Sequence, residues 1–172
     1  LRKILEKIQF FFSYPFGEYS SSLKNIVIEL GFKYAFGQHS GVVDYTKNFF
    51  EMPRFPINEK YGEIERFKTI LKTLPFPFKL IKPEDKYIGD KNNPPKVNIQ
   101  FYDNIKNLKN INCFSNEEDK WRNSKINFKS SNDLDIILDG KFTTERGRIN
   151  CSLREDSGFY RWLGIQFVIK EN

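Results

Sequence analysis

A short turn near the start of the chain carries the side chains best suited to contacting a substrate. Pro15-Phe16-Gly17, flanked by Tyr14 and Glu18, directly follows an apolar run. A Pro-aromatic-Gly turn at the end of a strand presents backbone N–H groups and a ring, and ligands of parallel sheets bind at the carboxyl edge of the strands. The sequence therefore predicts a substrate-binding turn here, with a plain strand-to-helix turn as the alternative.

Two further side chains are candidates for catalysis. His39, the only histidine in the chain, stands after an apolar segment and suits a general acid or a ligand contact. Arg54 lies between Pro53 and Phe55, a rigid setting that suits bidentate pairing with a carboxylate. The alternatives are a surface-loop histidine and an exposed arginine whose stem packs on Phe55.

The elements that position these residues follow from the hydrophobic periodicity. Residues 9–14 and 33–37 are short apolar runs typical of buried strands. Residues 1–8, 20–30 and 61–72 repeat apolar side chains at helical spacing. Helices and strands that alternate with short connections predict a parallel α/β layer.

The second half of the chain has a different period. Residues 83–96 are polar and proline-rich, which predicts a linker between residues 1–82 and residues 97–172. Beyond it, apolar residues alternate with polar ones in six short segments, which predicts a small antiparallel β-sandwich. These segments are Val97–Phe101, Ile111–Cys113, Ile126–Phe128, Leu134–Ile136, Ile149–Leu153 and Leu163–Ile169.

Composition excludes several classes of protein. The 172 residues are 39% hydrophobic and 16% aromatic, which excludes a mainly disordered chain. No apolar run has the length of a membrane helix. A single histidine excludes any site that needs two, and the two cysteines lack the spacing of a zinc knuckle. The net charge of +6 is spread along the chain without an arginine-rich stripe, so we expect no nucleic-acid partner.

Seven segments stand in an order and spacing that are specific as a set: Phe12–Tyr19, Glu29–Phe32, Ala35–Gly41, Pro53–Gly62, Asn93–Pro95, Gly147–Cys151 and Arg161–Phe167. In them, and so over nearly its whole length, the chain resembles the second half of a polysaccharide deacetylase (NodB-homology) domain with an appended β module. The resemblance implies the C-terminal half of a distorted (β/α) barrel, followed by the sandwich.

The resemblance also implies a reaction. The family hydrolyses acetyl groups on polysaccharides, using a divalent metal, with zinc the expected ion, held by one Asp and two His. These ligands precede the Pro-aromatic-Gly turn in the family. With one histidine the present chain cannot build that site, so we expect no metal and no activity in this fragment alone. The whole protein would act on an N-acetylated polysaccharide in the periplasm or outside the cell.

Individual residues inherit roles only where they match the family. Pro15-Phe16-Gly17 matches the groove-wall motif, in which the backbone N–H of the aromatic residue helps to bind the oxyanion. The family often has an arginine three residues before this aromatic residue, where the present chain has Ser13. Arg54 is the candidate replacement that orients the base. His39 is the candidate acid, although it stands outside the family's Leu-x-His motif.

Export has a consequence for Cys113 and Cys151. Both lie in alternating segments and point to the sandwich core. In an oxidising compartment two such thiols would form a disulfide, and the alternative is a pair of buried free thiols.

Two other functions remain open at this stage. A non-catalytic carbohydrate-binding or cell-envelope protein could use its aromatic side chains to stack on sugars; the candidates are Tyr14, Phe16, Tyr19, Trp121 and Trp162. A nucleic-acid binder is the weaker alternative, and it would reveal itself by a steep salt dependence.

Overall fold

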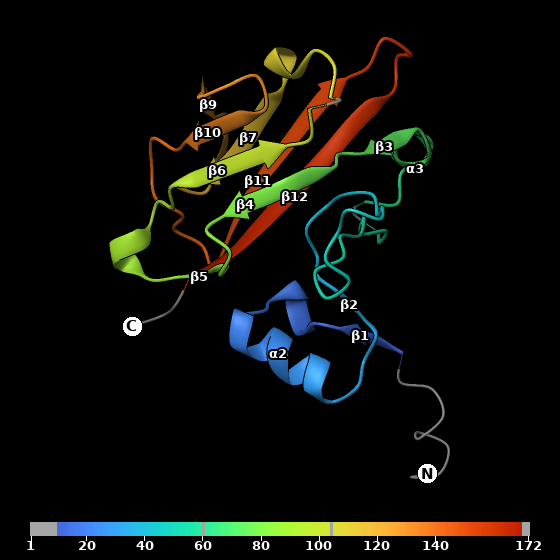
Figure 1. Ribbon diagram of the computed structural model, residues 1–172, viewed down its shortest axis with the longest axis vertical. Coiled ribbons are helices and arrows are strands. Elements are labelled where there is room, and N and C mark those ends of the chain that lie inside the picture. The colour runs from blue at the N-terminus through green and yellow to red at the C-terminus, as the bar shows by residue number, and fades with distance from the viewer. Residues whose placement is uncertain (1–9, 60, 104, 170–172) are drawn as a thin grey trace.

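The computed structural model describes residues 10–59, 61–103 and 105–169 (Figure 1). The helix predicted over residues 1–8 lies outside these residues. The described part is a mostly β protein with two α-helices and three sheets, mixed and antiparallel, and it contains no closed barrel. None of its helices has the length and hydropathy needed to cross a membrane.

A small βαβ unit forms the N-terminal layer. Strands β1 (Phe11–Ser13) and β2 (Tyr34–Phe36) pair in parallel, and the 3-10 turn η1 (Pro15–Gly17) and helix α2 (Ser21–Glu29) connect them. Ser20 caps α2, because its Oγ accepts a hydrogen bond of 3.1 Å from the N–H of Leu23. The predicted strands and helix are thus confirmed over shorter ranges.

The second helix, α3 (Ile64–Leu71), is confirmed within the predicted range 61–72. None of its residues is buried. The apolar side chains of one face of the helix, Ile64, Phe67 and Leu71, are exposed.

The β-sandwich is larger than the sequence predicts. Its four-stranded sheet runs in the order β4 (Phe78–Lys82), β6 (Val97–Phe101), β10 (Asp133–Ile137) and β9 (Lys125–Phe128). The six-stranded sheet contains β3 (Thr73–Pro75), β12 (Tyr160–Ile169), β11 (Arg146–Arg154), β7 (Asn112–Glu117), β8 (Lys120–Asn123) and β5 (Tyr87–Ile88). All six predicted strands are present, and β3, β4, β5 and β8 are additional.

Residues 83–96, predicted as a linker, pack on the sandwich. They carry β5 and the 3-10 turn η2 (Asp90–Asn92). The buried side chain of Asn93 donates a hydrogen bond of 2.8 Å to the carbonyl of Phe142 and accepts one of 2.9 Å from its N–H. Since β3 and β4 also belong to its sheets, the sandwich begins near Thr73 rather than at residue 97.

One hydrophobic core fills the space between the two sheets. It includes a disulfide between Cys113 and Cys151, whose Sγ atoms lie 2.07 Å apart. The two cysteines are fully buried and are direct cross-strand partners on β7 and β11, so the bond lies within one sheet.

The N-terminal layer packs against the sandwich through β12 and β11 (Figure 1). The N–H of Gly164 donates to the carbonyl of Ser40 at 2.6 Å, and Arg146 forms an ion pair of 2.6 Å with Glu18. This contact places the loop after β2 over the edge of β12. The Pro15–Gly17 turn and His39, both candidates from the sequence, lie along this junction between the N-terminal layer and the sandwich.

Candidate functional sites

The Phe16 turn, residues Tyr14–Glu18, stands at the carboxyl end of β1. Two hydrogen bonds close it, from the N–H of Gly17 to the carbonyl of Tyr14 at 2.8 Å and from the N–H of Glu18 to that of Pro15 at 3.0 Å. The N–H of Phe16 belongs to neither bond. Phe16 has a φ of 54°, in the left-handed region, and its side chain is 66% exposed. The turn therefore presents the ring of Phe16, and the N–H of Phe16 is not used in closing the turn.

Close packing explains the glycine of this turn. Gly17 has a φ of +72°, and a Cβ there would lie 2.3 Å from the backbone nitrogen of Gln38. Only glycine allows the ends of β1 and β2 to approach this closely.

Side chains from β11 and β12 of the sandwich contact the Phe16 turn. The guanidinium carbon of Arg146 lies 5.0 Å from the centre of the Phe16 ring, and its Nε contacts the carboxylate of Glu18. The amide of Gln166 donates to the carbonyl of Phe16 at 3.3 Å. Glu18 is thus engaged with Arg146, while Pro15 is exposed beside the ring.

Tyr14 belongs to the core of the N-terminal layer rather than to its surface. It is 1% exposed, its hydroxyl donates to the carbonyl of Phe50 at 3.1 Å, and its ring stacks on Tyr19 at 4.8 Å. Burial, with a smaller contribution from the carboxylate of Glu51, raises the pKa of Tyr14 to about 12. A ligand at the Phe16 turn does not contact this side chain.

Arg54 ties the loop to the end of β2. Its Nε donates to the carbonyl of Gly37 at 2.9 Å, and its backbone N–H donates to the carbonyl of His39 at 3.0 Å. No carboxylate of a described residue lies within ion-pair distance of its guanidinium. Its observed contacts are with the backbone of the loop, and its role in orienting a base stays a prediction.

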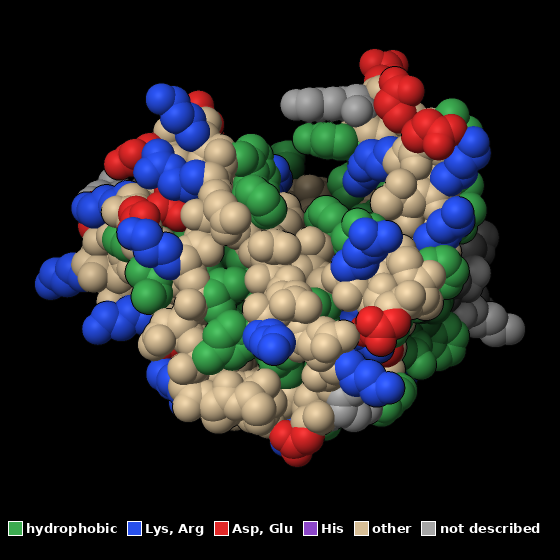
Figure 2. Space-filling model, turned by 90° about the horizontal axis from the view of Figure 1, so that it is seen from above, with side chains coloured by type: hydrophobic (Ala, Val, Ile, Leu, Met, Phe, Trp, Pro, Cys, Tyr) green, Lys and Arg blue, Asp and Glu red, His purple; other side chains and the backbone are tan. Residues whose placement is uncertain are grey.

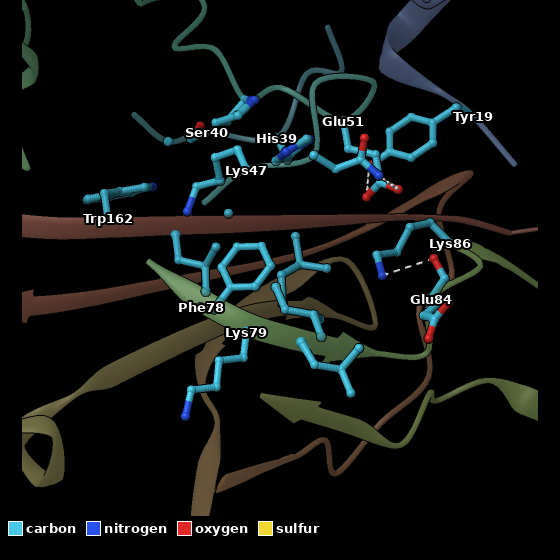
Figure 3. A pocket seen from close by; sticks show the side chains of 18 of the residues that line it. Tyr19, His39, Ser40, Lys47, Glu51, Phe78, Lys79, Glu84, Lys86 and Trp162 are labelled. Atoms are coloured by element: carbon cyan, nitrogen blue, oxygen red, sulfur yellow. Dashed lines mark hydrogen bonds between the residues drawn. The ribbon is translucent and has the colours of Figure 1, made fainter. Parts of the chain in front are cut away.

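His39 lines a different feature, a cavity of about 210 Å³ that we call the junction cavity (Figure 3). Its walls come from the loop 39–53, from β4 and from the edge of β12. The side chains of the cavity that matter below are Lys24, His39, Lys47, Glu51, Phe78, Leu80, Lys86 and Trp162. Lys79 borders the cavity through its position on β4, but its ammonium group is directed away from it towards Asp103 (Figure 3).

Burial determines the charge state of His39. It lowers the pKa of the imidazole to about 4, against the smaller opposing effect of the carboxylate of Glu51. The ring is therefore neutral near pH 7. A neutral imidazole suits hydrogen bonding to a ligand better than it suits proton donation as a general acid.

The cations of the junction cavity have different partners. Lys24 forms an ion pair of 2.5 Å with Glu51, and Lys47 forms one of 3.4 Å with Asp44. Lys86 is 8% exposed and donates to the carbonyls of Pro83 and Glu84, but no described carboxylate lies within ion-pair distance of its Nζ. Burial lowers the pKa of Lys86 to about 8.

The residues of this chain do not fit the metal that the resemblance implies. The sequence has one histidine, and the described residues contain no group of three His, Cys, Asp or Glu side chains that could hold an ion.

The structure thus separates the predicted site residues: Phe16 and Glu18 lie at the turn and His39 lines the cavity. Tyr14 is buried in the N-terminal layer, and Arg54 contacts the backbone of the loop.

Three residues of these sites, Arg146, Glu51 and Lys86, were not predicted from the sequence. Each is an ordinary charged residue in its own segment, and only the folded contacts distinguish it.

No protein-family model matches the chain, and no curated protein matches it either.

Proposed function

We propose that the chain is the C-terminal, polysaccharide-facing part of an exported deacetylase of the NodB-homology type. In this proposal the βαβ unit is the last portion of the distorted barrel, and the Phe16 turn forms a wall of the groove that holds the polymer. The observation that carries the proposal is the exposed Phe16, held at a left-handed φ at the carboxyl end of a parallel strand.

The conformation of Phe16 supports a functional role. A non-glycine residue in the left-handed region costs of order 1–3 kcal/mol and persists where its surroundings fix it. Here Gln166 holds the carbonyl of Phe16, and Arg146 lies beside its ring. A ring fixed in this way can stack on the apolar face of a sugar, while its N–H is available to an acetyl oxygen.

The chain would contribute binding and orientation rather than bond cleavage. Metal-assisted hydrolysis needs ligands that this sequence does not contain, so the fragment by itself should release no acetate. The Cys113–Cys151 disulfide supports export, because such bonds persist mainly in oxidising compartments. The same surface also suits the second candidate, a carbohydrate-binding protein without catalysis.

Titration of the chain with N-acetylated chito-oligosaccharide, followed by amide chemical shifts, tests the proposal. We expect saturable shifts at Phe16 and Gly17, and at least about tenfold weaker binding by Phe16→Ala, since stacking is lost. Phe159→Ala is the matched control. Phe159 is 41% exposed and directly precedes β12, whereas the Phe16 turn contacts Gln166 near the other end of this strand. Absence of shifts at the turn, or equal weakening by both variants, would refute sugar binding there.

An acetate assay on the same samples tests whether the chain catalyses deacetylation by itself, which neither the proposed deacetylase fragment nor a carbohydrate-binding protein should do. Acetate released above a blank without protein would contradict the expected inactivity of the fragment.

A further inference from the structure

The junction cavity lies at a gap in the edge of β12. Strand β3 pairs with residues 160–162 and β5 with residues 168–169, so residues 163–167 have no described strand beside them on this edge. The loop after β2 covers the gap through an isolated bridge between Gly41 and Leu163. The result is a concave space between a loop and a β-sandwich, open on one side, of the kind in which small ligands bind.

Lys86 gives this space a positive charge that no ion pair neutralises: the carboxylates of Glu51, Asp85 and Glu84 favour its charged form from beyond ion-pair distance. Its ammonium group points towards the middle of the cavity in Figure 3, and its hydrogen-bond partners are the neutral carbonyls of Pro83 and Glu84. Of the carboxylates of the lining, Glu51 is paired with Lys24 and Glu84 is exposed. A buried cation without an anion is costly, so a bound anion would be favoured here.

Trp162 adds an unused hydrogen-bond donor at the other side of the cavity. Its indole Nε1 is buried and has no hydrogen-bond partner among the described residues. Figure 3 shows Trp162 beside Lys47, across the cavity from Lys86. Buried donors are almost always satisfied, so this one indicates an acceptor that the protein itself does not supply.

The remaining lining limits the size and polarity of the ligand. Phe78 and Leu80 form an apolar wall between the two donors, and His39 adds a neutral imidazole. The volume of about 210 Å³ lies below the range of drug-sized pockets. A ligand that fits has a carboxylate at one end, an oxygen acceptor at the other and carbon between them.

We propose that the junction cavity binds a small organic carboxylate of about monosaccharide size, such as a hexuronic acid, with its carboxylate at Lys86 and a hydroxyl oxygen at Trp162. This site is separate from the Phe16 turn, and the inference does not depend on the function proposed for that turn.

The probe is sodium glucuronate, with glucose as its neutral counterpart. The chain has two tryptophans, and Trp121 is 54% exposed, so its indole signal is an internal reference. We expect glucuronate to shift the indole N–H signal of Trp162 saturably, while that of Trp121 stays in place and glucose has no effect. Equal shifts with both sugars, or no saturable shift at tens of millimolar glucuronate, would overturn the proposal.

Two lysine variants test the role assigned to charge. Lys86→Met should weaken glucuronate binding by at least about tenfold, because a charge-assisted contact is lost. Lys79→Met is the matched control and should leave binding unchanged, since Lys79 points out of the cavity to Asp103. If Lys79→Met weakens binding as much as Lys86→Met, the assignment is wrong.

Trp162→Phe is the second variant, and it keeps the proposal testable if Lys86→Met does not fold. It removes the indole donor and keeps a ring, so binding measured by calorimetry should weaken several-fold. Unchanged affinity would refute the hydrogen bond to Trp162. Phe16→Ala should leave glucuronate binding intact, which separates failure of this proposal from failure of the proposed polysaccharide contact.

Discussion

His39 shows how strongly the surroundings of one residue change its chemistry. Isolated in sequence between Gln38 and Ser40, it has the features of an exposed loop histidine with a pKa near 6.5. In the fold this loop residue lines the junction cavity, and burial lowers the pKa of its imidazole to about 4. The residue type predicts a proton donor near neutral pH, whereas the environment favours an uncharged hydrogen-bonding group.

The first prediction follows from this pKa. Because the chain has one histidine, its imidazole signal in a proton NMR titration is unambiguous, and we expect a midpoint near pH 4. The same signal in urea should titrate near 6.5. A native midpoint close to 6.5 would show that the ring is solvated.

The same shift affects stability. The folded pKa lies below the unfolded one, so the contribution is fully present above pH 6.5 and is lost as the pH falls towards 4. Its size is on the order of 1–3 kcal/mol. His39→Gln should therefore lose less unfolding free energy than the wild type between pH 6.5 and 4, as measured by urea unfolding at each pH.

Among the elements, prediction succeeds where the chain alternates cleanly. The six strands with alternating apolar residues are all present, because one side of each faces a core. Strand β8 was missed because Lys120–Asn123 has no fully buried face. Strands β3 and β4 were missed because the prolines of Leu74-Pro75-Phe76-Pro77-Phe78 favour extended backbone without indicating that it pairs in a sheet. Proline is tolerated there since β3 is a short edge strand.

The junction cavity could not be predicted, because its walls come from segments far apart in sequence. Lys86 lies in a stretch that resembles a polar linker, and Trp162 lies in the last strand. Only the pairing of β5 and β3 with the same strand brings them together. By contrast, the Phe16 turn was predictable as a turn, since Pro and Gly determine its local geometry.

A prediction about β12 tests the contact that covers the cavity. A Cβ on Gly164 would lie 2.6 Å from both the backbone nitrogen and the backbone oxygen of Ser40, so Gly164→Ala must displace the loop. We expect a loss of about 1–3 kcal/mol in unfolding free energy, measured in urea. Gly89→Ala is the control, because a Cβ there meets no atom within 4 Å. Equal stability of the two variants would show that the loop is not held against β12.

At the scale of the whole molecule, the net positive charge does not gather into a basic stripe on the face seen from above (Figure 2). On the face seen in Figure 2, Lys and Arg side chains are scattered around the rim, and Asp and Glu lie among them. The net charge of +6 is therefore spread rather than concentrated into a stripe on this face. Such a surface gives weak, non-specific attraction at most.

The disulfide acts on the whole sandwich through the loop that it closes. Cys113 and Cys151 are separated by 38 positions, and the chain between them includes β8 in one sheet and β9 and β10 in the other. In the unfolded chain, the bond thus limits the conformations of a segment whose strands pair in both sheets of the folded protein. On the chain-entropy estimate, a loop of this length contributes about 4 kcal/mol to stability.

Reduction should therefore lower the stability of the sandwich as a unit. We expect urea unfolding in the presence of a phosphine reductant to show about 3–4 kcal/mol less unfolding free energy than in its absence. A variant with both Cys113→Ala and Cys151→Ala controls for other effects of the reductant, to which it should be insensitive. Thiol titration of the denatured, unreduced protein should find no free thiol, because both cysteines of the chain are in the bond. Two free thiols, or identical unfolding curves with and without reductant, would contradict a stabilising bond. They would also remove the support that the disulfide lends to export.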